Sequence, residues 1–175
     1  TGKIGKFGVG LVNIQADDEG ATSPATPATN FTVVRLKRDV FKKSTIGVMA
    51  TNRSSSNVAG ATNNLAYGAD ASVGLFENLQ VGGYWARTDT ACASGGTATA
   101  CEALQGDAVS YQGRFDYFAD RYGVRAEYLK VGDDFNPEVG FIQRDDFKRS
   151  FASLRFSPRP KDFLGVRKFT WQGDV

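Results

Sequence analysis

The stretch that decides the fold is Tyr67-Gly68-Ala69-Asp70-Ala71-Ser72-Val73-Gly74-Leu75, followed across the turn Glu77-Asn78 by Leu79-Gln80-Val81-Gly82-Gly83-Tyr84-Trp85-Ala86. In both segments the odd-numbered residues are apolar or small, and the even-numbered residues are mostly polar or glycine. Successive side chains of a β-strand point to opposite faces, so each segment has one apolar and one polar face. The stretch therefore predicts two strands, residues 64–76 and 79–88, joined by a tight turn.

The same alternation extends along the chain and predicts nine strands, at residues 3–16, 30–39, 44–53, 64–76, 79–88, 107–118, 121–131, 143–157 and 163–172. Long polar stretches at 17–29, 54–63, 88–107 and 132–141 alternate with tight connections near 39–44, 77–78, 119–121 and 157–162. A chain with every long loop on one side is an antiparallel up-and-down meander, and this asymmetry is typical of transmembrane β-barrels of the outer-membrane type. Several expected strands are also longer than the roughly 5–6 residues of soluble strands and reach the roughly 9–11 needed to cross a bilayer.

Size and composition are compatible with this interpretation. The 175 residues form a single domain, and a mean hydropathy of −0.31 with no long apolar run excludes a transmembrane helix. Alternating strands average their two faces, so hydropathy does not detect them. Bacterial single-chain barrels have an even number of strands, and the chain begins without a signal segment. We therefore expect about nine strands of a larger barrel, with the remaining strands outside this sequence.

Two sets of side chains follow from the alternation. The residues expected to line the lumen are polar or charged: Asp70, Gln112, Arg114, Asp116, Arg125 and Glu127. Rings expected to form an aromatic girdle at the membrane interface lie on the apolar face near the long loops: Tyr67, Trp85, Tyr111 and Tyr128. In a soluble β-sandwich the same polar face would meet solvent and the apolar face would form the core. Alternation alone does not separate the two arrangements.

The sharpest local motif is Gly132-Asp133-Asp134-Phe135-Asn136-Pro137-Glu138. Its side-chain oxygens at Asp133, Asp134 and Glu138 could bind a hard cation, although the spacing is not that of an EF-hand loop. The alternative is an Asn-Pro turn whose Asx side chains bond the local backbone. The chain has no histidine, no Gly-x-Ser-x-Gly elbow and no phosphate-binding glycine loop, so we expect neither an enzyme nor a cofactor.

Charge and cysteine content point to partners and compartment. A net charge of +2 without a run of basic residues argues against nucleic acid as a partner. The cysteines, Cys92 and Cys101, lie in one loop rich in Gly, Ser, Thr and Ala, where a local disulfide in an oxidising compartment is favoured. A pair of free thiols is the alternative.

Several segments of the chain resemble a known protein family. The most specific is the run Gly132-Asp133-Asp134-Phe135-Asn136-Pro137-Glu138-Val139-Gly140-Phe141, and the others are residues 27–35, 46–53, 67–70, 144–147 and 155–160. Over nearly its whole length the chain resembles the outer-membrane barrel domain of a family of large bacterial proteins of unassigned function. In that family the barrel follows a module similar to a family-nine carbohydrate-binding domain. The resemblance implies a bacterial outer-membrane location and a glycan partner reached through a module that this chain lacks. It implies no catalytic residues.

The sequence thus predicts an outer-membrane barrel segment whose partners are the lipid bilayer and the remainder of the barrel or associated outer-membrane subunits. Three functions stay open. The segment could belong to a transport pore with a water-filled lumen, or to a membrane anchor of a larger protein in glycan or polymer handling, with a lumen closed by ion pairs. The alternative is a soluble β-sandwich binding module.

Overall fold

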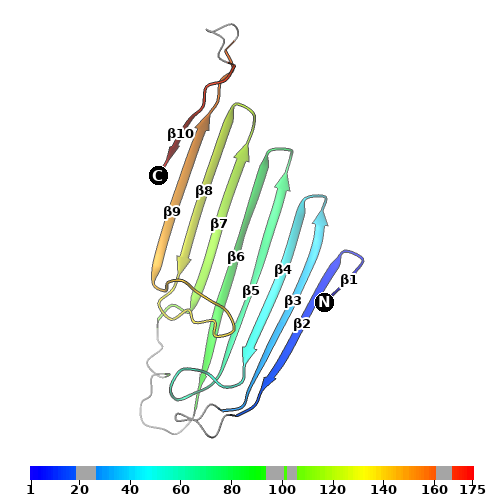
Figure 1. The fold of residues 1–175 in the computed structure, drawn as a ribbon, viewed down its shortest axis with the longest axis vertical. Coiled ribbons are helices and arrows are strands. Elements are labelled where there is room, and N and C mark those ends of the chain that lie inside the picture. The colour runs from blue at the N-terminus through cyan, green and yellow to red at the C-terminus, as the bar shows by residue number, and fades with distance from the viewer. Residues whose placement is uncertain (19–26, 94–100, 102–105, 161–166) are drawn as a thin grey trace.

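A single antiparallel sheet makes up the fold (Figure 1). The computed structural model describes residues 1–18, 27–93, 101, 106–160 and 167–175. Its strands are β1 (Gly2–Ile4), β2 (Phe7–Ala16), β3 (Thr29–Phe41), β4 (Ser44–Arg53), β5 (Ala61–Leu75), β6 (Leu79–Cys92), β7 (Val109–Phe118), β8 (Tyr122–Val131), β9 (Phe147–Phe156) and β10 (Trp171–Asp174). They lie in the sheet in chain order, and every neighbouring pair is antiparallel.

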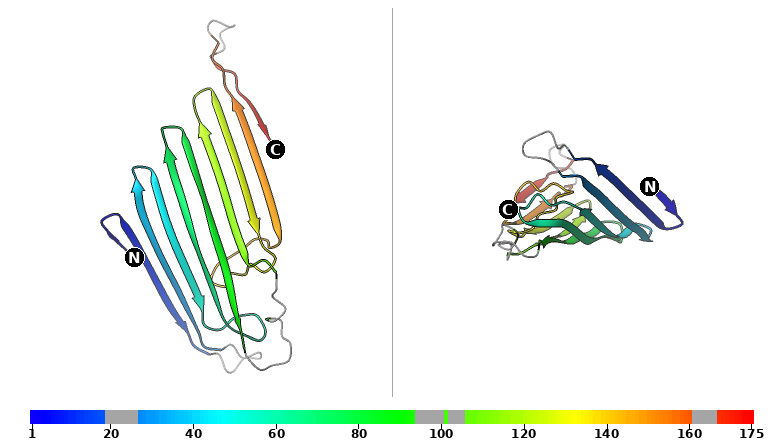
Figure 2. Two further views of the ribbon diagram at one scale, coloured as in Figure 1. Left: turned by 180° about the vertical axis from the view of Figure 1, so that it is seen from behind. Right: turned by 90° about the horizontal axis from the view of Figure 1, so that it is seen from below.

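The connections divide by length between the two ends of the sheet, which confirms the predicted all-β meander. Long connections follow β2, β4, β6 and β8 at the lower end of Figure 1, and tight turns follow β1, β3, β5 and β7 at the upper end. The connection after β9 departs from the expected tight turn near residues 157–162, because β9 ends at Phe156 and β10 begins only at Trp171. Figure 2 shows the same sheet from behind and from below, where its twist is visible. Consecutive strands thus pair with their sequence neighbours throughout.

Three strand predictions are corrected by the structure. The expected strand at 3–16 is two strands, because Gly5, at a φ of 59°, turns the chain between β1 and β2. The sheet therefore has ten strands, not nine. Residues 143–146 precede β9 instead of opening it, and of the expected strand at 163–172 only Trp171 and Gln172 pair, within β10; residues 163–166 lie outside the described part of the chain.

The sheet is open at both edges. Among the described residues β1 pairs only with β2 and β10 only with β9, so the two edges do not meet to close a barrel. β1 is short and covers β2 only from Phe7 to Val9. The described residues also form no second sheet, so the two-layer sandwich is not the observed arrangement.

Burial in this sheet is inverted relative to a water-soluble domain. The buried apolar residues are few: Ala66, Cys101, Val131 and Phe135. The buried polar residues are more numerous: Thr29, Ser44, Thr51, Asn64, Thr88, Ser110, Asp116 and Ser157. Large apolar side chains such as Leu11, Val48, Phe115 and Leu154 are exposed along one face from β2 to β9. The molecule therefore covers polar groups and leaves an apolar surface bare.

No helix long and apolar enough to cross a membrane occurs in the described part of the chain.

Candidate functional site

The polar face of the sheet carries the residues that were expected to line a lumen. In an antiparallel sheet, residues directly opposite one another on neighbouring strands share a face. The register pairs Asp70 with Tyr84 and Tyr84 with Gln112, and it pairs Arg114 with Glu127 and Asp116 with Arg125. All six predicted residues consequently lie on this one face, which we call the polar face. It is less polar near the β2 edge, where Val12 and Ile14 lie on it.

Cross-strand ion pairs satisfy the charges of the polar face on β7, β8 and β9. Asp116 is only 6% exposed and lies between two guanidinium groups, with Arg114 Nε at 2.7 Å and Arg125 Nε at 2.8 Å. Glu127 on β8 pairs with Arg149 on β9. Since burying a carboxylate without a partner is costly, the two arginines account for the burial of Asp116.

A longer ion pair spans three strands. Arg35 on β3 reaches over β4 to Asp70 on β5, with 2.5 Å between Arg35 Nη1 and Asp70 Oδ1. The residue beneath the pair is Gly47, and a Cβ at that position would lie 2.7 Å from Arg35 Nη2. A glycine is therefore required for the guanidinium to lie in this position.

The connection between β8 and β9, residues 132–146, folds over the long-loop end of the polar face; we call it the β8–β9 loop. Thr88 Oγ1 receives a hydrogen bond from the Asn136 backbone N–H at 3.1 Å. Asn64 is fully buried: its Nδ2 donates to the Asn136 carbonyl at 3.0 Å, and its Oδ1 accepts from the Glu138 N–H at 3.2 Å. The loop is thus bonded to β5 and β6 rather than extending beyond the sheet.

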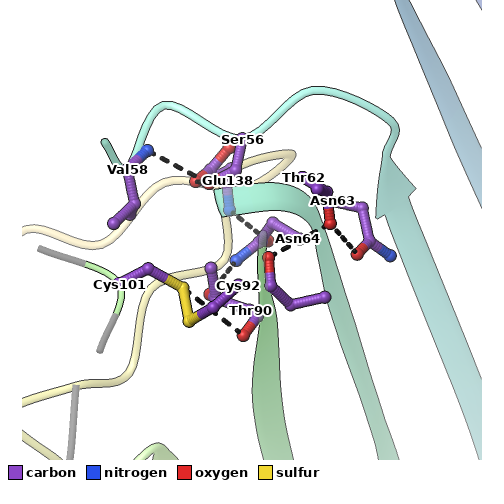
Figure 3. The surroundings of a disulfide bond; sticks show 10 residues. Ser56, Val58, Thr62, Asn63, Asn64, Thr90, Cys92, Cys101 and Glu138 are labelled. Atoms are coloured by element: carbon purple, nitrogen blue, oxygen red, sulfur yellow. Dashed lines mark hydrogen bonds between the residues drawn. A yellow bond between two sulfur atoms is a disulfide. The ribbon is translucent and has the colours of Figure 1, made fainter. Parts of the chain in front are cut away.

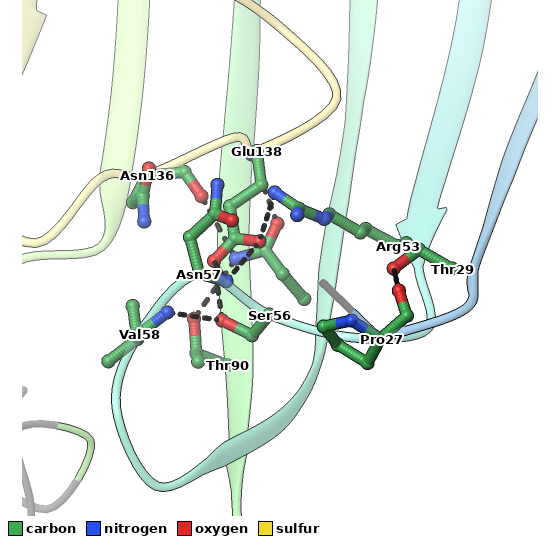
Figure 4. A network of polar contacts seen from close by, with 10 residues as sticks. Pro27, Thr29, Arg53, Ser56, Asn57, Val58, Thr90, Asn136 and Glu138 are labelled. Atoms are coloured by element: carbon green, nitrogen blue, oxygen red, sulfur yellow. Dashed lines mark hydrogen bonds and ion pairs between the residues drawn. The ribbon is translucent and has the colours of Figure 1, made fainter. Parts of the chain in front are cut away.

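A buried carboxylate holds the centre of the β8–β9 loop (Figure 4). The Glu138 side chain is 2% exposed, and its Oε2 lies 3.3 Å from Arg53 Nη1 at the end of β4. Its oxygens also accept hydrogen bonds from the Ser56 hydroxyl at 2.5 Å and from the Asn57 N–H at 2.9 Å. Arg53 stacks in turn over the Phe31 ring, 5.5 Å from its centroid. The loop after β4 and the loop after β8 are therefore joined through one carboxylate.

The residues considered for a cation bind protein groups instead. Asp133 Oδ1 accepts the Asp107 N–H at 2.7 Å, and Asp134 accepts the Gly106 N–H. Among the described residues no group of three or more His, Cys, Asp or Glu side chains is arranged to hold a metal ion. The alternative interpretation was a turn whose Asx side chains bond the local backbone. Asx side chains do bond backbone N–H groups here, but these groups belong to the segment before β7 and not to the turn itself.

Asp107 fastens that segment to β8. Its carboxylate accepts a hydrogen bond from Lys130 Nζ and another from the Val109 N–H at 3.1 Å. The hydrogen bond from Lys130 lowers the pKa of Asp107 below its ordinary value, against a smaller opposing effect of burial. Acidic side chains thus hold the base of the β8–β9 loop from two segments: Asp133 and Asp134 in the loop itself, and Asp107 in the segment before β7.

A cavity of about 430 Å³ lies between the β8–β9 loop and the polar face. Residues of β3 to β6, including the Arg35–Asp70 pair, line it on the side of the sheet, and Phe135, Pro137 and Phe141 line it on the side of the loop. The volume falls in the range of about 300–1,000 Å³ that is typical of small-molecule sites.

The four rings expected to form a girdle lie on the opposite, apolar face. The Tyr67 and Trp85 ring centroids are 6.1 Å apart, and those of Tyr111 and Tyr128 are 6.0 Å apart. Trp85 and Tyr111 are direct cross-strand partners, so the rings form one row across four strands. A second aromatic group lies near the tight turns and contains Tyr122, Phe156 and Trp171.

The predicted disulfide joins Cys92 and Cys101, whose Cα atoms are 5.6 Å apart (Figure 3). Cys92 is the last residue of β6 and not part of a loop, because β6 is longer than expected. The backbone N–H groups of Ala93 and Cys101 donate to the carbonyls of Gly60 and Ala59, so the bridge lies against the start of β5.

Sequence reasoning missed the residues that dock the β8–β9 loop: Arg53, Asn64, Thr88 and Asp107. For Asn64 and Thr88 there was a signal, since each is a polar residue on the polar side of an alternating strand. For Arg53 there was none, because its partner is far away in the sequence. No match to this chain was found among protein-family models, curated proteins or solved structures.

Proposed function

We propose that this chain is one arc of a β-barrel in a bacterial outer membrane, with the apolar face toward lipid and the polar face toward the lumen. It would serve a larger protein as a membrane anchor or as the wall of a channel. The proposal keeps the resemblance described above, and a role in handling glycans or other polymers rests on that resemblance alone.

The main support for the proposal is that the β8–β9 loop covers the polar face of the sheet and not the apolar face. The β8–β9 loop lies over the polar face and buries Glu138 and Asn64 there. Among the described residues nothing packs over the apolar face, where Leu11 and Leu154 are each more than half exposed. A water-soluble protein would cover the apolar face. Lipid is a solvent that favours the reverse arrangement, and aromatic rows toward both ends of the strands fit its two interfaces.

The open edges also support an arc of a larger sheet. Along β2 the backbone groups from Gly10 onward have no strand on their outer side among the described residues. Backbone groups inside a bilayer must be paired, so membrane sheets close on themselves. Further strands, from the same protein or from a neighbouring subunit, would supply the pairing.

Between the two roles, the contacts favour an anchor. Asp116 and Glu127 are paired with arginines, and the β8–β9 loop occupies part of the polar face. A lumen lined in this way is narrowed by its own side chains and loop. A conductance measurement in planar bilayers separates the roles: an anchor leaves the bilayer silent, whereas a channel gives discrete current steps.

The two native tryptophans allow a direct test of the membrane placement. Trp85 and Trp171 both lie on the apolar face, and they are the only tryptophans of the chain. After reconstitution into vesicles of brominated phospholipid, we expect both to lose most of their fluorescence, because bromine quenches indole on contact. The matched control is Gln112→Trp in a chain whose native tryptophans are replaced by Phe. This reporter on the polar face should keep its fluorescence.

Two results would contradict the proposal. One is equal quenching of the native tryptophans and of the reporter at position 112. The other is a chain that remains monodisperse in buffer without detergent and does not associate with vesicles.

A further inference from the structure

We propose that the cavity between the β8–β9 loop and the polar face binds a small uncharged amphiphile, with a body of one or two rings and a hydroxyl head. The inference concerns this cavity alone and does not depend on the membrane placement. It rests on three features of the lining: an apolar interior, a neutral ion pair, and an aromatic residue at the mouth.

The interior is apolar although it lies on the polar face. On the side of the sheet, Val33, Met49, Ala66 and Ala86 project from four neighbouring strands, and the loop adds the buried Phe135 from above. The small side chains of Ala66 and Ala86 leave the space that the larger groups enclose. An engineered cavity of roughly 150 Å³ accepts one benzene ring, so about 430 Å³ has room for two fused rings.

The charged part of the lining is the Arg35–Asp70 pair, about one third exposed on each side chain, and Thr51 and Tyr84 line the same cavity. A carboxylate accepts hydrogen bonds and a guanidinium donates them, so the pair satisfies a hydroxyl group, which does both. An anionic head would lie beside the like charge of Asp70, and a cationic head beside that of Arg35. Such like-charge contacts are strongly unfavourable, and the pair therefore selects an uncharged head.

The mouth of the cavity is formed by Phe141, which lines it and is 86% exposed. An exposed phenylalanine at the open side of an apolar cavity can cover the outer ring of a bound molecule. It also provides a test residue whose replacement does not disturb a packed core.

The test uses equilibrium dialysis of 2-naphthol against the purified chain, with the same micelle concentration on both sides of the membrane. Partition into detergent then cancels, and excess naphthol on the protein side reports binding. We expect a saturable excess of one molecule per chain. Phe141→Ala should weaken it by about three- to tenfold, the usual worth of one aromatic contact. The control is Phe76→Ala, because Phe76 is 87% exposed and lies outside this cavity.

Two further measurements test whether the cavity prefers a ligand with an uncharged hydroxyl head group. At neutral pH 2-naphthoate should bind at least about tenfold more weakly than 2-naphthol, since its charge meets Asp70. The double variant Arg35→Leu, Asp70→Leu should lose the preference for naphthol over naphthalene while it still binds naphthalene. No saturable excess, or an equal excess with Phe141→Ala, would overturn the site. Equal binding of naphthoate and naphthol would overturn the assigned class of ligand.

Discussion

Glu138, in the loop after β8, and Arg53, at the end of β4, form an ion pair of 3.3 Å that is almost entirely shielded from solvent. The carboxylate has three protein donors, namely Arg53, the Ser56 hydroxyl and the Asn57 N–H. Among the described ion pairs it has the least exposed carboxylate, and it joins the centre of the β8–β9 loop to the end of β4.

Removing this carboxylate should release the loop. Glu138→Gln leaves Arg53 in a buried position without its counter-charge, and breaking a buried pair in this way costs about 3–5 kcal/mol. Since the loop can undock locally, we expect the loss to appear as faster amide exchange in residues 132–146 before any change in the strands. Hydrogen–deuterium exchange followed by mass spectrometry measures both regions at once.

Two controls accompany this prediction. Asp120→Asn removes the pair between Asp120 and Arg159, in which both side chains are more than half exposed, and should change stability by at most about 1 kcal/mol. The double variant Arg53→Met, Glu138→Leu replaces the buried pair by apolar groups, which is often neutral, and should keep the loop docked. Fast exchange of the loop in that double variant would show that the hydrogen bonds of the carboxylate to Ser56 and Asn57, and not the unpaired charge on Arg53, decide docking.

Substitutions on the two faces should have unequal costs. Val124 lies on the apolar face of β8, two residues from the Tyr122 ring and four from Tyr128. If this face meets lipid, Val124→Arg should cost about 2–4 kcal/mol near the bilayer midplane. Gln112→Arg, on the polar face between Tyr84 and Leu129, should cost much less. Urea titrations in vesicles measure both, and equal tolerance would count against a lipid-facing Val124.

The strands and the faces of their side chains could be predicted well from the sequence, because both depend on the alternation of neighbouring residues. A period of two over residues 64–76 and 79–88 was sufficient to locate β5 and β6 to within a few residues, and it put Asp70 and Gln112 on the same face. The turn at Gly5 was missed because the polarity of residues 3–16 is irregular throughout. Apolar residues move from an even position at Ile4 to odd positions at Phe7, Val9 and Leu11, and back to even positions at Val12 and Ile14, so no single break identifies the turn.

The site was harder to predict because its contacts are distant in sequence. The acidic motif at residues 133–138 looked like a set of cation ligands. In the fold, its oxygens accept N–H groups from residues 106, 107 and 57. Those donors come from two other loops. The predicted meander already brings these loops to the same end of the sheet, but no local pattern encodes which donor of one loop meets which acceptor of another.

The disulfide should stabilise the end of β6 more than the sheet as a whole. The bridge between Cys92 and Cys101 closes a short segment, and in the entropy model such a loop contributes on the order of 2–3 kcal/mol. The pair variant Cys92→Ser, Cys101→Ser should therefore increase amide exchange at positions 93 and 101, whose N–H groups bond the segment before β5. Mass spectrometry of non-reduced peptides checks the bridge itself. Two alkylatable thiols in freshly isolated protein would refute it.

Acid should loosen the base of the β8–β9 loop through Asp107. Its pKa in the folded chain is lowered from an ordinary value of 3.8, chiefly by the hydrogen bond from Lys130. A carboxyl group with a depressed pKa stabilises the fold fully above its ordinary pKa, and this stabilisation is lost as the pH falls through the folded value. Wild type and Asp107→Asn should thus differ by a constant amount between about pH 5 and pH 8, and the difference should shrink below about pH 4. Comparing their urea midpoints at each pH cancels the contribution of every other titratable group, because both chains share those groups. A difference that persists unchanged at the lowest pH would mean that the amide introduced by Asp107→Asn disturbs the contact for steric reasons and that the charge of Asp107 contributes nothing to it.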